Sequence, residues 1–371
     1  MTLRQRIEQE ILRCGPIPFS RYMELCLYDP ELGYYSRNAE QFGKAGDFYT
    51  SSDVHAVFGR LLARQFNEMW RVLRSPVKIA IVELGPGRGL FAQDVLAWSE
   101  KKFPEFFRAL RLVLIESSPA LRNRLKERLA SQIAEGKVSV ADDIDSADFG
   151  ENTIVFANEF FDALPVEVLD HRGELRIGVD AGRLAEQFVA PSAAVLDYID
   201  RYSVQPDPGE RVEAPLIAQK YMARVAEKLQ RGFFGAIDYG YTRDELLAGR
   251  HRGTVTAFRQ HTMSVNPYEA PGEQDLTAHV NFTALRAAGE QAGLDHLALL
   301  TQAQFLMGIG EENQFADAFE DCGSRQEQTK VALQLKHLVT PAGIGETFHV
   351  LLTSRGVHRE AAMKMGGLRF A

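Results

Sequence analysis

The sequence predicts an α/β protein built around a mostly parallel, Rossmann-like sheet. Short, continuous apolar runs alternate with helical or polar stretches, a texture typical of strands that are buried on both faces. The first runs occupy 79–82, 112–115, 153–157 and 233–237. A glycine-rich loop at 83–89 follows the first run and precedes a helical pattern, which is the local order of a βαβ unit.

Later apolar runs extend the predicted sheet almost to the end of the chain. Strand candidates follow at 254–257, 297–300 and 348–352. We therefore expect a Rossmann-like core over 76–356, followed by a C-terminal tail at 357–371.

The residues before the core lack this strand pattern, and we expect 1–75 to form a cap or lid. They begin with an amphipathic stretch and continue through a turn-like segment at 29–35 to a glycine-containing segment at 43–52. Helical insertions are expected within the core at about 191–232 and 259–290, and insertions of this size often shape a substrate pocket.

The first insertion contains a predicted helix after Pro215 that stops at Gly232. Its expected apolar face consists of Ile217, Tyr221, Val225 and Leu229.

Composition is that of a soluble globular protein, with 371 residues, 45% of them hydrophobic and 25% charged. Residues 1–14 contain no uninterrupted apolar stretch, so we expect a cytoplasmic protein without membrane association. The three cysteines form no C-x-x-C pair, which favours free thiols. The net charge of −8 has the wrong sign for binding driven by phosphate contacts, so no nucleic-acid partner is expected.

The glycine loop is the first candidate ligand site. It begins at Glu83 and carries Gly85, Gly87 and Gly89, so a ligand can approach the backbone closely at a helix N-terminus. Dinucleotide-binding loops normally read G-x-G-x-x-G, whereas this loop reads G-x-G-x-G, and Pro86 lacks an amide that a pyrophosphate would need. These differences favour the methionine end of S-adenosylmethionine over NAD.

Glu116 ends the next strand and is the candidate acceptor for the ribose hydroxyls, as the acidic residue is in dinucleotide-binding folds. The alternative is that the glycine loop is only a tight turn kept for packing and that Glu116 is a surface residue. The cofactor site is favoured, because strand, loop, helix, strand and acid follow one another in the order that such a site requires. A Walker-type P-loop around Gly43 and Lys44 is excluded, because Asn38 and Ala45 do not fit that motif.

Polar residues that follow later strands predict the reaction site. Asn158 ends one strand, with Glu159 and Asp162 after it, and Asp238 ends another strand at the same edge of the sheet. His279 belongs to a long loop that can reach this edge. Carboxylates suit a cationic acceptor, because a guanidinium pairs with them bidentately.

These residues also have structural interpretations. Glu159 and Asp162 would stabilise a helix if one began there, and a lone histidine such as His279 is more often structural than catalytic. The histidines lack metal-ligand spacing, and no G-x-S-x-G elbow is present, so neither a metal site nor a hydrolase is supported. The Pro-Pro-aromatic motif common in amino methyltransferases that act on nucleobases is also missing.

Several ordered motifs together resemble one family, the MidA-like methyltransferases. This group is widespread in bacteria and is related to the mitochondrial complex I assembly factor that methylates arginine. The resemblance extends over nearly the whole chain. The motifs lie at 28–35, 46–51, 83–89, 158–165, 237–241, 271–272 and 275–280.

The resemblance implies a seven-stranded methyltransferase sheet, S-adenosylmethionine as the methyl donor, and an N-terminal segment that folds over it. Gly46, Asp47 and Thr50 would contact the cofactor from that segment, and Asn158 would contact it at the carboxyl edge of the sheet. The chain departs from the family pattern at Ser52-Asp53, usually Pro-Glu. It also has Asn266 and Asn281 where Asp is usual. Asn281 can still cap a helix, whereas the other departures fall where they can tune the acceptor pocket.

We therefore expect a methyltransferase that N-methylates an arginine side chain of a protein partner, by resemblance a respiratory complex I subunit. Glu159, with Asp162 or Asp238, would orient the guanidinium and accept the proton it loses. The alternatives are a methyltransferase for a small molecule or RNA, and a non-catalytic assembly factor that binds the cofactor without turnover. Methyl transfer to protein extracts distinguishes a protein acceptor from a small molecule or RNA. Cofactor binding without turnover on any partner would identify the non-catalytic assembly factor.

Overall fold

The computed structural model describes residues 1–37, 56–245, 253–259, 262–264 and 266–371. A central sheet of eight strands organises this part of the chain. Every predicted strand except 254–257 lies in this sheet. Its strands are β2 (Ile79–Leu84), β3 (Leu110–Ile115), β4 (Val138–Ala141), β5 (Asn152–Asn158), β10 (Arg231–Tyr241), β14 (Val280–Asn281), β15 (Asp295–Thr301) and β16 (Phe348–Arg355).

The central sheet is mixed. Its strand order is β15-β16-β10-β5-β2-β3-β4, with β14 paired to the end of β10. The neighbours from β10 to β4 are parallel, whereas β16 runs antiparallel to both β10 and β15. The predicted mostly parallel sheet is therefore confirmed only in part, because an apolar run has the same texture in either strand direction.

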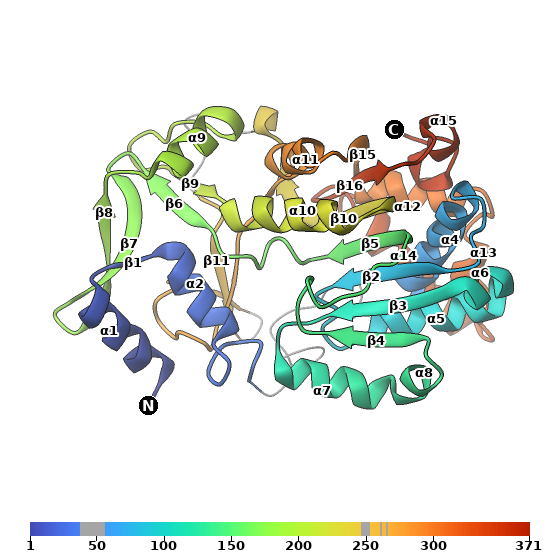
Figure 1. The fold of residues 1–371 in the computed structure, drawn as a ribbon, viewed down its shortest axis with the longest axis horizontal. Helices are drawn as coiled ribbons and strands as arrows, with labels where there is room; N and C mark the ends of the chain where they lie inside the picture. The colour runs from blue at the N-terminus through green and yellow to red at the C-terminus, as the bar shows by residue number, and fades with distance from the viewer. Residues whose placement is uncertain (38–55, 246–252, 260–261, 265) are drawn as a thin grey trace.

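Helices cover both faces of the central sheet (Figure 1). Ile79 and Ile81 of β2 lie in the core on one face, and Val82 and Leu84 lie in the core on the other, as the alternation of side chains along a strand requires. The first face is covered by α4 (Ala56–Val72), α5 (Leu90–Lys102), α12 (Gln302–Glu311) and α14 (Arg325–Val339). The second face is covered by α10 (Leu216–Lys228) and α11 (Phe282–Gln291). Further helices in this part of the chain are α6 (Pro104–Ala109), α7 (Pro119–Arg128), α8 (Ala130–Ala134), α13 (Ala316–Phe319) and α15 (Arg359–Ala362).

A second, antiparallel sheet lies beside the central one and was not predicted (Figure 1). Its strands alternate polar and apolar residues, as in the segment 173–180, so they lack continuous apolar runs. The helices α1 (Leu3–Cys14) and α2 (Phe19–Tyr28) pack on this sheet, and α9 (Ala193–Tyr202) packs beside it. The strands are β1 (Ile17–Pro18), β6 (Glu167–Asp170), β7 (Gly173–Asp180), β8 (Arg183–Val189) and β9 (Arg211–Ala214).

The predicted cap segment 1–75 is divided between two hydrophobic cores. Its α1 and α2 pack on the second sheet, whereas Phe58, Leu62 and Phe66 of α4 lie in the core beneath the central sheet. The prediction that 254–257 is a core strand is wrong. That run leads into a small antiparallel sheet formed by β11 (Thr256–Arg259), β12 (Thr262–Ser264) and β13 (Asp275–Thr277).

The helix predicted after Pro215 is present as α10, but its buried face differs from the expected one. The fully buried positions include Ala218, Met222 and Val225, while Ile217 and Tyr221 are only half-buried. Apolar spacing alone does not distinguish side chains that fill a core from those that line a cavity.

Candidate functional site

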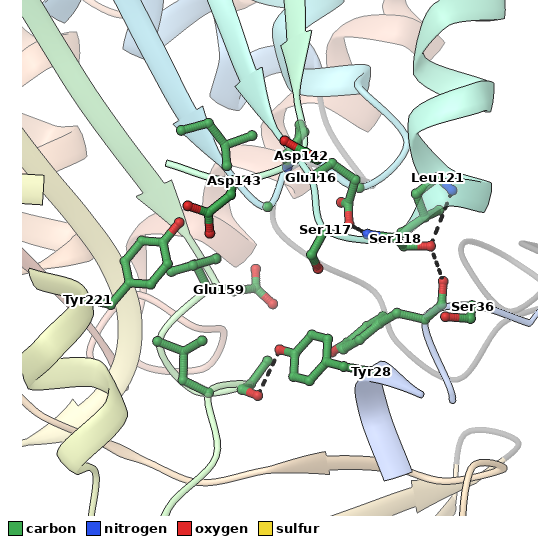
Figure 2. Close-up of a pocket in the computed structure, with 18 of the residues that line it drawn as sticks. Tyr28, Ser36, Glu116, Ser117, Ser118, Leu121, Asp142, Asp143, Glu159 and Tyr221 are labelled. Atoms are coloured by element: carbon green, nitrogen blue, oxygen red, sulfur yellow. Dashed lines mark hydrogen bonds between the residues drawn. The ribbon is translucent and has the colours of Figure 1, made fainter. Parts of the chain in front are cut away.

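A cavity of about 460 Å³ lies at the carboxyl edge of the central sheet (Figure 2). The segments that follow β2, β3, β4 and β5 form one wall, and residues of α2 and the turn after it lie opposite. This volume is within the range of sites that hold a small molecule or cofactor. Of the predicted site residues, Gly85, Gly87, Glu116, Asn158, Glu159 and Asp162 line the cavity.

The glycine loop contributes its backbone to the cavity, and each glycine has a different reason to be there. All three have positive φ, at 64° for Gly85, 52° for Gly87 and 73° for Gly89. A Cβ on Gly85 would lie 2.9 Å from the Phe160 ring, whereas a Cβ on Gly87 would meet no described atom within 4 Å. A Cβ on Gly89 would lie 2.6 Å from Leu125. Gly89 therefore serves helix packing and does not line the cavity, which corrects its predicted place.

Glu116 directly follows β3 and lines the cavity. Its Oε1 accepts a 2.8 Å hydrogen bond from the backbone N–H of Ser118, and the side chain is buried. Burial raises the pKa of Glu116 to about 7, although backbone hydrogen bonds, first that of Ser118, oppose this shift.

Glu83 does not line the cavity, unlike Glu116. It is buried in β2, and its Oε2 accepts no hydrogen bond from the described residues. Burial raises the pKa of Glu83 to about 8.

Glu159 is held in an unusual backbone conformation that places its side chain in the cavity. Its φ is 49°, in the left-handed region that non-glycine residues rarely adopt, and its N–H donates to the carbonyl of Ile237 at 2.9 Å. Asn158 Nδ2 donates to Glu159 Oε1 at 3.3 Å. Figure 2 shows the carboxylate between Tyr221 and Tyr28, pointing into the cavity.

No helix begins at Glu159 or Asp162, because residues 159–165 form bends and turns. The alternative in which these acids only stabilise a helix N-terminus is therefore wrong.

Asp238 is fully buried and does not line the cavity, so its predicted place at the reaction site is wrong. Its Oδ2 accepts hydrogen bonds from the backbone N–H groups of Phe161 and Asp162, at 3.0 and 3.3 Å. It therefore supports the turn that carries Asp162. Burial, followed by the nearby charges of Asp162 and Glu159, raises the pKa of Asp238 well above its usual range.

His279 is exposed and lies outside the cavity, between the buried residues Ala278 and Val280. Its backbone N–H donates to Thr254 Oγ1 at 3.0 Å, and its ring meets the Tyr239 ring edge-on at 5.1 Å between centroids. The structural interpretation of this histidine fits these contacts better than the catalytic one.

Several cavity residues were missed by the sequence reasoning. Asp142 and Asp143 follow β4, whose alternating sequence hid the strand. Tyr221 of α10 lies beside Asp143 (Figure 2), and the charge of Asp143 acts on its hydroxyl. Tyr28 and Tyr35 fall within a quoted motif but were given no role. The hydroxyl of Tyr28 donates to the carbonyl of Ala163 at 2.9 Å, and that of Tyr35 donates to Asp275 Oδ1 at 3.0 Å.

The remaining predicted residues lie elsewhere. Gly46, Asp47, Thr50 and the Ser52-Asp53 departure fall outside the described residues. Asn266 accepts the N–H of Tyr268 at 3.0 Å in a turn away from the cavity. Asn281 caps α11 as predicted, accepting the N–H of Ala284 at 3.1 Å.

The structure describes residues 1–37, 56–245, 253–259, 262–264 and 266–371. No group of three or more histidine, cysteine or acidic residues there is arranged to hold a metal ion. Within the same ranges, no helix is long and apolar enough to cross a membrane.

The cavity residues fit S-adenosylmethionine. The open space above Gly87 allows a ligand to reach the loop backbone, and the Glu116 carboxylate lies in the same cavity. Asp142 directly follows β4, the neighbour of β3, and its carboxylate can make a further polar contact with the nucleoside part of the ligand.

Comparisons with known proteins agree with this fit. A Burkholderia thailandensis structure, described as a likely methyl transferase bound to S-adenosyl-homocysteine, superimposes with a TM-score of 0.82 at 30% identity. That match covers 98% of this chain and 94% of the other. The Drosophila melanogaster "Protein arginine methyltransferase NDUFAF7 homolog, mitochondrial" is 29% identical, covering 96% of this chain and 85% of the relative. The Danio rerio "Protein arginine methyltransferase NDUFAF7, mitochondrial" is 28% identical, covering 98% and 90%.

These relatives correct one expectation and establish the family. The predicted cytoplasmic location is contradicted, because the curated relatives are named as mitochondrial proteins. The family described as "Putative S-adenosyl-L-methionine-dependent methyltransferase" matches residues 61–300, which is more than half of the chain. The chain therefore belongs to this family of S-adenosylmethionine-dependent methyltransferases.

Proposed function

We propose that this methyltransferase transfers the methyl group of S-adenosylmethionine to an arginine side chain of a protein. The observation that carries the proposal is the Glu159 carboxylate, which enters the cavity from a left-handed backbone position close to the glycine loop. A left-handed non-glycine residue is unfavourable, so its retention at a cavity indicates a role there. The naming of several relatives as protein arginine methyltransferases supports the same acceptor.

The cofactor would be held by the walls of the cavity. Gly85 and Gly87 would present backbone to the methionine end, and Glu116 would accept hydrogen bonds from the ribose hydroxyls. Asn158 would bind beside the loop. By resemblance, Gly46, Asp47 and Thr50 would cover the cofactor, and the role of Glu83 would be to support the loop from β2. When bound, S-adenosylmethionine supplies an electrophilic methyl group.

Glu159 and Asp162 would act on the acceptor. Their carboxylates would orient the guanidinium through charge-assisted hydrogen bonds and receive the proton that it loses. Exclusion of water by Tyr28 and Tyr221, which flank Glu159 in Figure 2, would strengthen these contacts. Asp238 would contribute by supporting the turn rather than by touching the substrate.

Protonation of Glu116 predicts a pH-dependent affinity for S-adenosylhomocysteine. Ribose hydroxyls donate best to an ionised carboxylate, so ligand binding should weaken as the pH falls below about 7, by up to about tenfold per pH unit. Calorimetry between pH 5.5 and 8 measures this, and Glu116→Gln should flatten the profile. A variant with the wild-type slope and affinity would exclude Glu116 from the ribose site.

The acidic cavity disfavours RNA as the acceptor, since a phosphate backbone would meet Asp142, Asp143 and Asp275 on its walls. A complex I subunit as the partner stays a prediction from the resemblance.

Mass spectrometry of methylarginine in cells with and without the protein tests the proposed acceptor. We expect at least one protein arginine to lose its methylation when the gene is deleted and to regain it with the wild-type chain. Complementation with the Glu159→Gln variant should fail. If arginine methylation is unchanged and the enzyme instead methylates an RNA or small-molecule fraction, the acceptor is not arginine and the proposal is wrong.

A further inference from the structure

Tyr239 has no role in the site described so far, yet it is bonded to one of the acidic residues of the cavity. Its hydroxyl donates a 2.6 Å hydrogen bond to Asp162 Oδ2. Its ring, on β10, packs against His279 and Phe348, with centroid distances of 5.1 and 5.5 Å. This packing holds the Tyr239 ring in place, so the Tyr239 hydroxyl stays at the Asp162 carboxylate.

The second oxygen of Asp162 lacks a donor within the described part of the chain. Oδ1 is buried and makes no hydrogen bond with those residues, although Asp162 belongs to the cavity wall. The backbone N–H groups of Asp162 and Ala163 lie near the carboxyl group and lower its pKa, but neither is hydrogen-bonded to Oδ1. A buried acceptor without a donor is unfavourable, so its retention beside a cavity indicates that a ligand brings the donor. A guanidinium, with N–H donors on three nitrogens, is a ligand that can do so.

We propose that Tyr239 is a positioning residue for methyl transfer, which holds Asp162 so that its Oδ1 accepts an N–H group of the acceptor guanidinium. This inference rests on the proposed arginine acceptor. As the new N–C bond forms and the S–C bond breaks, the electron pair of that bond stays on sulfur. The methylated guanidinium keeps a single positive charge by losing one N–H proton, and the Asp162 carboxylate accepts that proton.

The surroundings of Asp162 decide which carboxylate is ionised. Burial raises the pKa of Asp162 to about 6, and the Tyr239 hydrogen bond opposes that shift. Asp238 and Glu159 face Asp162 from adjoining segments. Burial, followed by the nearby charges of Asp162 and Glu159, keeps the pKa of Asp238 well above its usual range, so Asp162 loses its proton first. Tyr28, Tyr35 and Asp275 are titratable groups that face this acid from other elements of the described chain.

The experiment compares Tyr239→Phe with the wild type. The variant keeps the ring and removes only the hydroxyl, so the pKa of Asp162 should rise by about one to two pH units. Carboxyl ¹³C NMR of the aspartate-labelled protein measures this pKa without any substrate, and Asp162→Asn assigns the resonance. The acidic limb of kcat/KM on an arginine-containing protein extract should move to higher pH by the same amount, while affinity for S-adenosylhomocysteine stays unchanged.

Tyr241→Phe is the matched control, because Tyr241 lies two residues further along β10 and is also buried. The charge that acts on its hydroxyl is that of Glu213, whereas Asp162 and Asp238 act on Tyr239. It should leave both the pKa and the pH profile as in the wild type. If the pKa of Asp162 does not shift in Tyr239→Phe, the inference is wrong. It is also wrong if that pKa shifts while the pH profile of kcat/KM stays where it is in the wild type. If no arginine is methylated by the wild type, the proposed function fails, while the NMR result still tests the contact between Tyr239 and Asp162.

Discussion

Gly87→Val should abolish measurable binding of S-adenosylmethionine and S-adenosylhomocysteine, weakening affinity by at least about a hundredfold, or about 2.7 kcal/mol. The added side chain would project into space that no described atom fills, on a residue that lines the cavity. A branched side chain there would occupy the place where a ligand reaches the loop backbone. Calorimetry and ligand-induced thermal shift measure the loss, since a ligand that binds only the folded state must stabilise it.

The control for this variant separates loss of the site from backbone strain. Gly87 has a φ of 52°, so valine there also destabilises the fold, by roughly 1–2 kcal/mol. Gly136 has a φ of 72°, likewise meets no described atom within 4 Å of an added Cβ, and lies outside the cavity. Gly136→Val should therefore lose similar stability but bind the ligand normally. Wild-type affinity in Gly87→Val would place the cofactor elsewhere.

The fold could be predicted from the sequence where strands are buried on both faces. The runs at 79–82 and 233–237 are short and continuously apolar, as strands of a covered sheet are, and both lie in the central sheet. The second sheet escaped prediction because its strands expose polar residues on one side, as β8 does. Strand direction was equally inaccessible, since the reversal of β16 depends on its pairing partners rather than on its own residues.

Site residues could be predicted where an acidic residue stands directly after a predicted strand, because both its chemistry and its position then indicate a ligand contact. Glu116 and Glu159 satisfy both conditions, and the structure brings them to one cavity. Asp238 satisfies them too, yet its side chain bonds to the backbone of a neighbouring turn, a tertiary contact that no local pattern specifies. Tyr28 reaches the cavity from the N-terminal region through contact with Ala163, which only the folded chain reveals.

Glu159→Gln should retain cofactor binding but lose at least about tenfold in methyl transfer, because it removes the negative charge while keeping size and one hydrogen-bond acceptor. A guanidinium would lose a charge-assisted partner worth about 1.5–3 kcal/mol, along with a proton acceptor. The backbone should not change, since glutamine tolerates the left-handed φ of 49° about as poorly as glutamate does. Single-turnover rates on a protein acceptor and the dissociation constant of S-adenosylhomocysteine, measured on one preparation, test this prediction.

Glu24→Gln supplies the matched control for that measurement. Glu24 also lines the cavity, but its carboxylate is paired with Arg21 at 2.8 Å and lies on α2, far along the chain from the reacting segment. Exposed pairs of this kind contribute at most about 1 kcal/mol, so neutralising Glu24 should leave turnover close to that of the wild type. Equal losses in the two variants would mean that the overall charge of the cavity attracts the acceptor. Unimpaired turnover in Glu159→Gln would remove Glu159 from the catalytic residues and leave Asp162 as the remaining predicted carboxylate on the cavity wall.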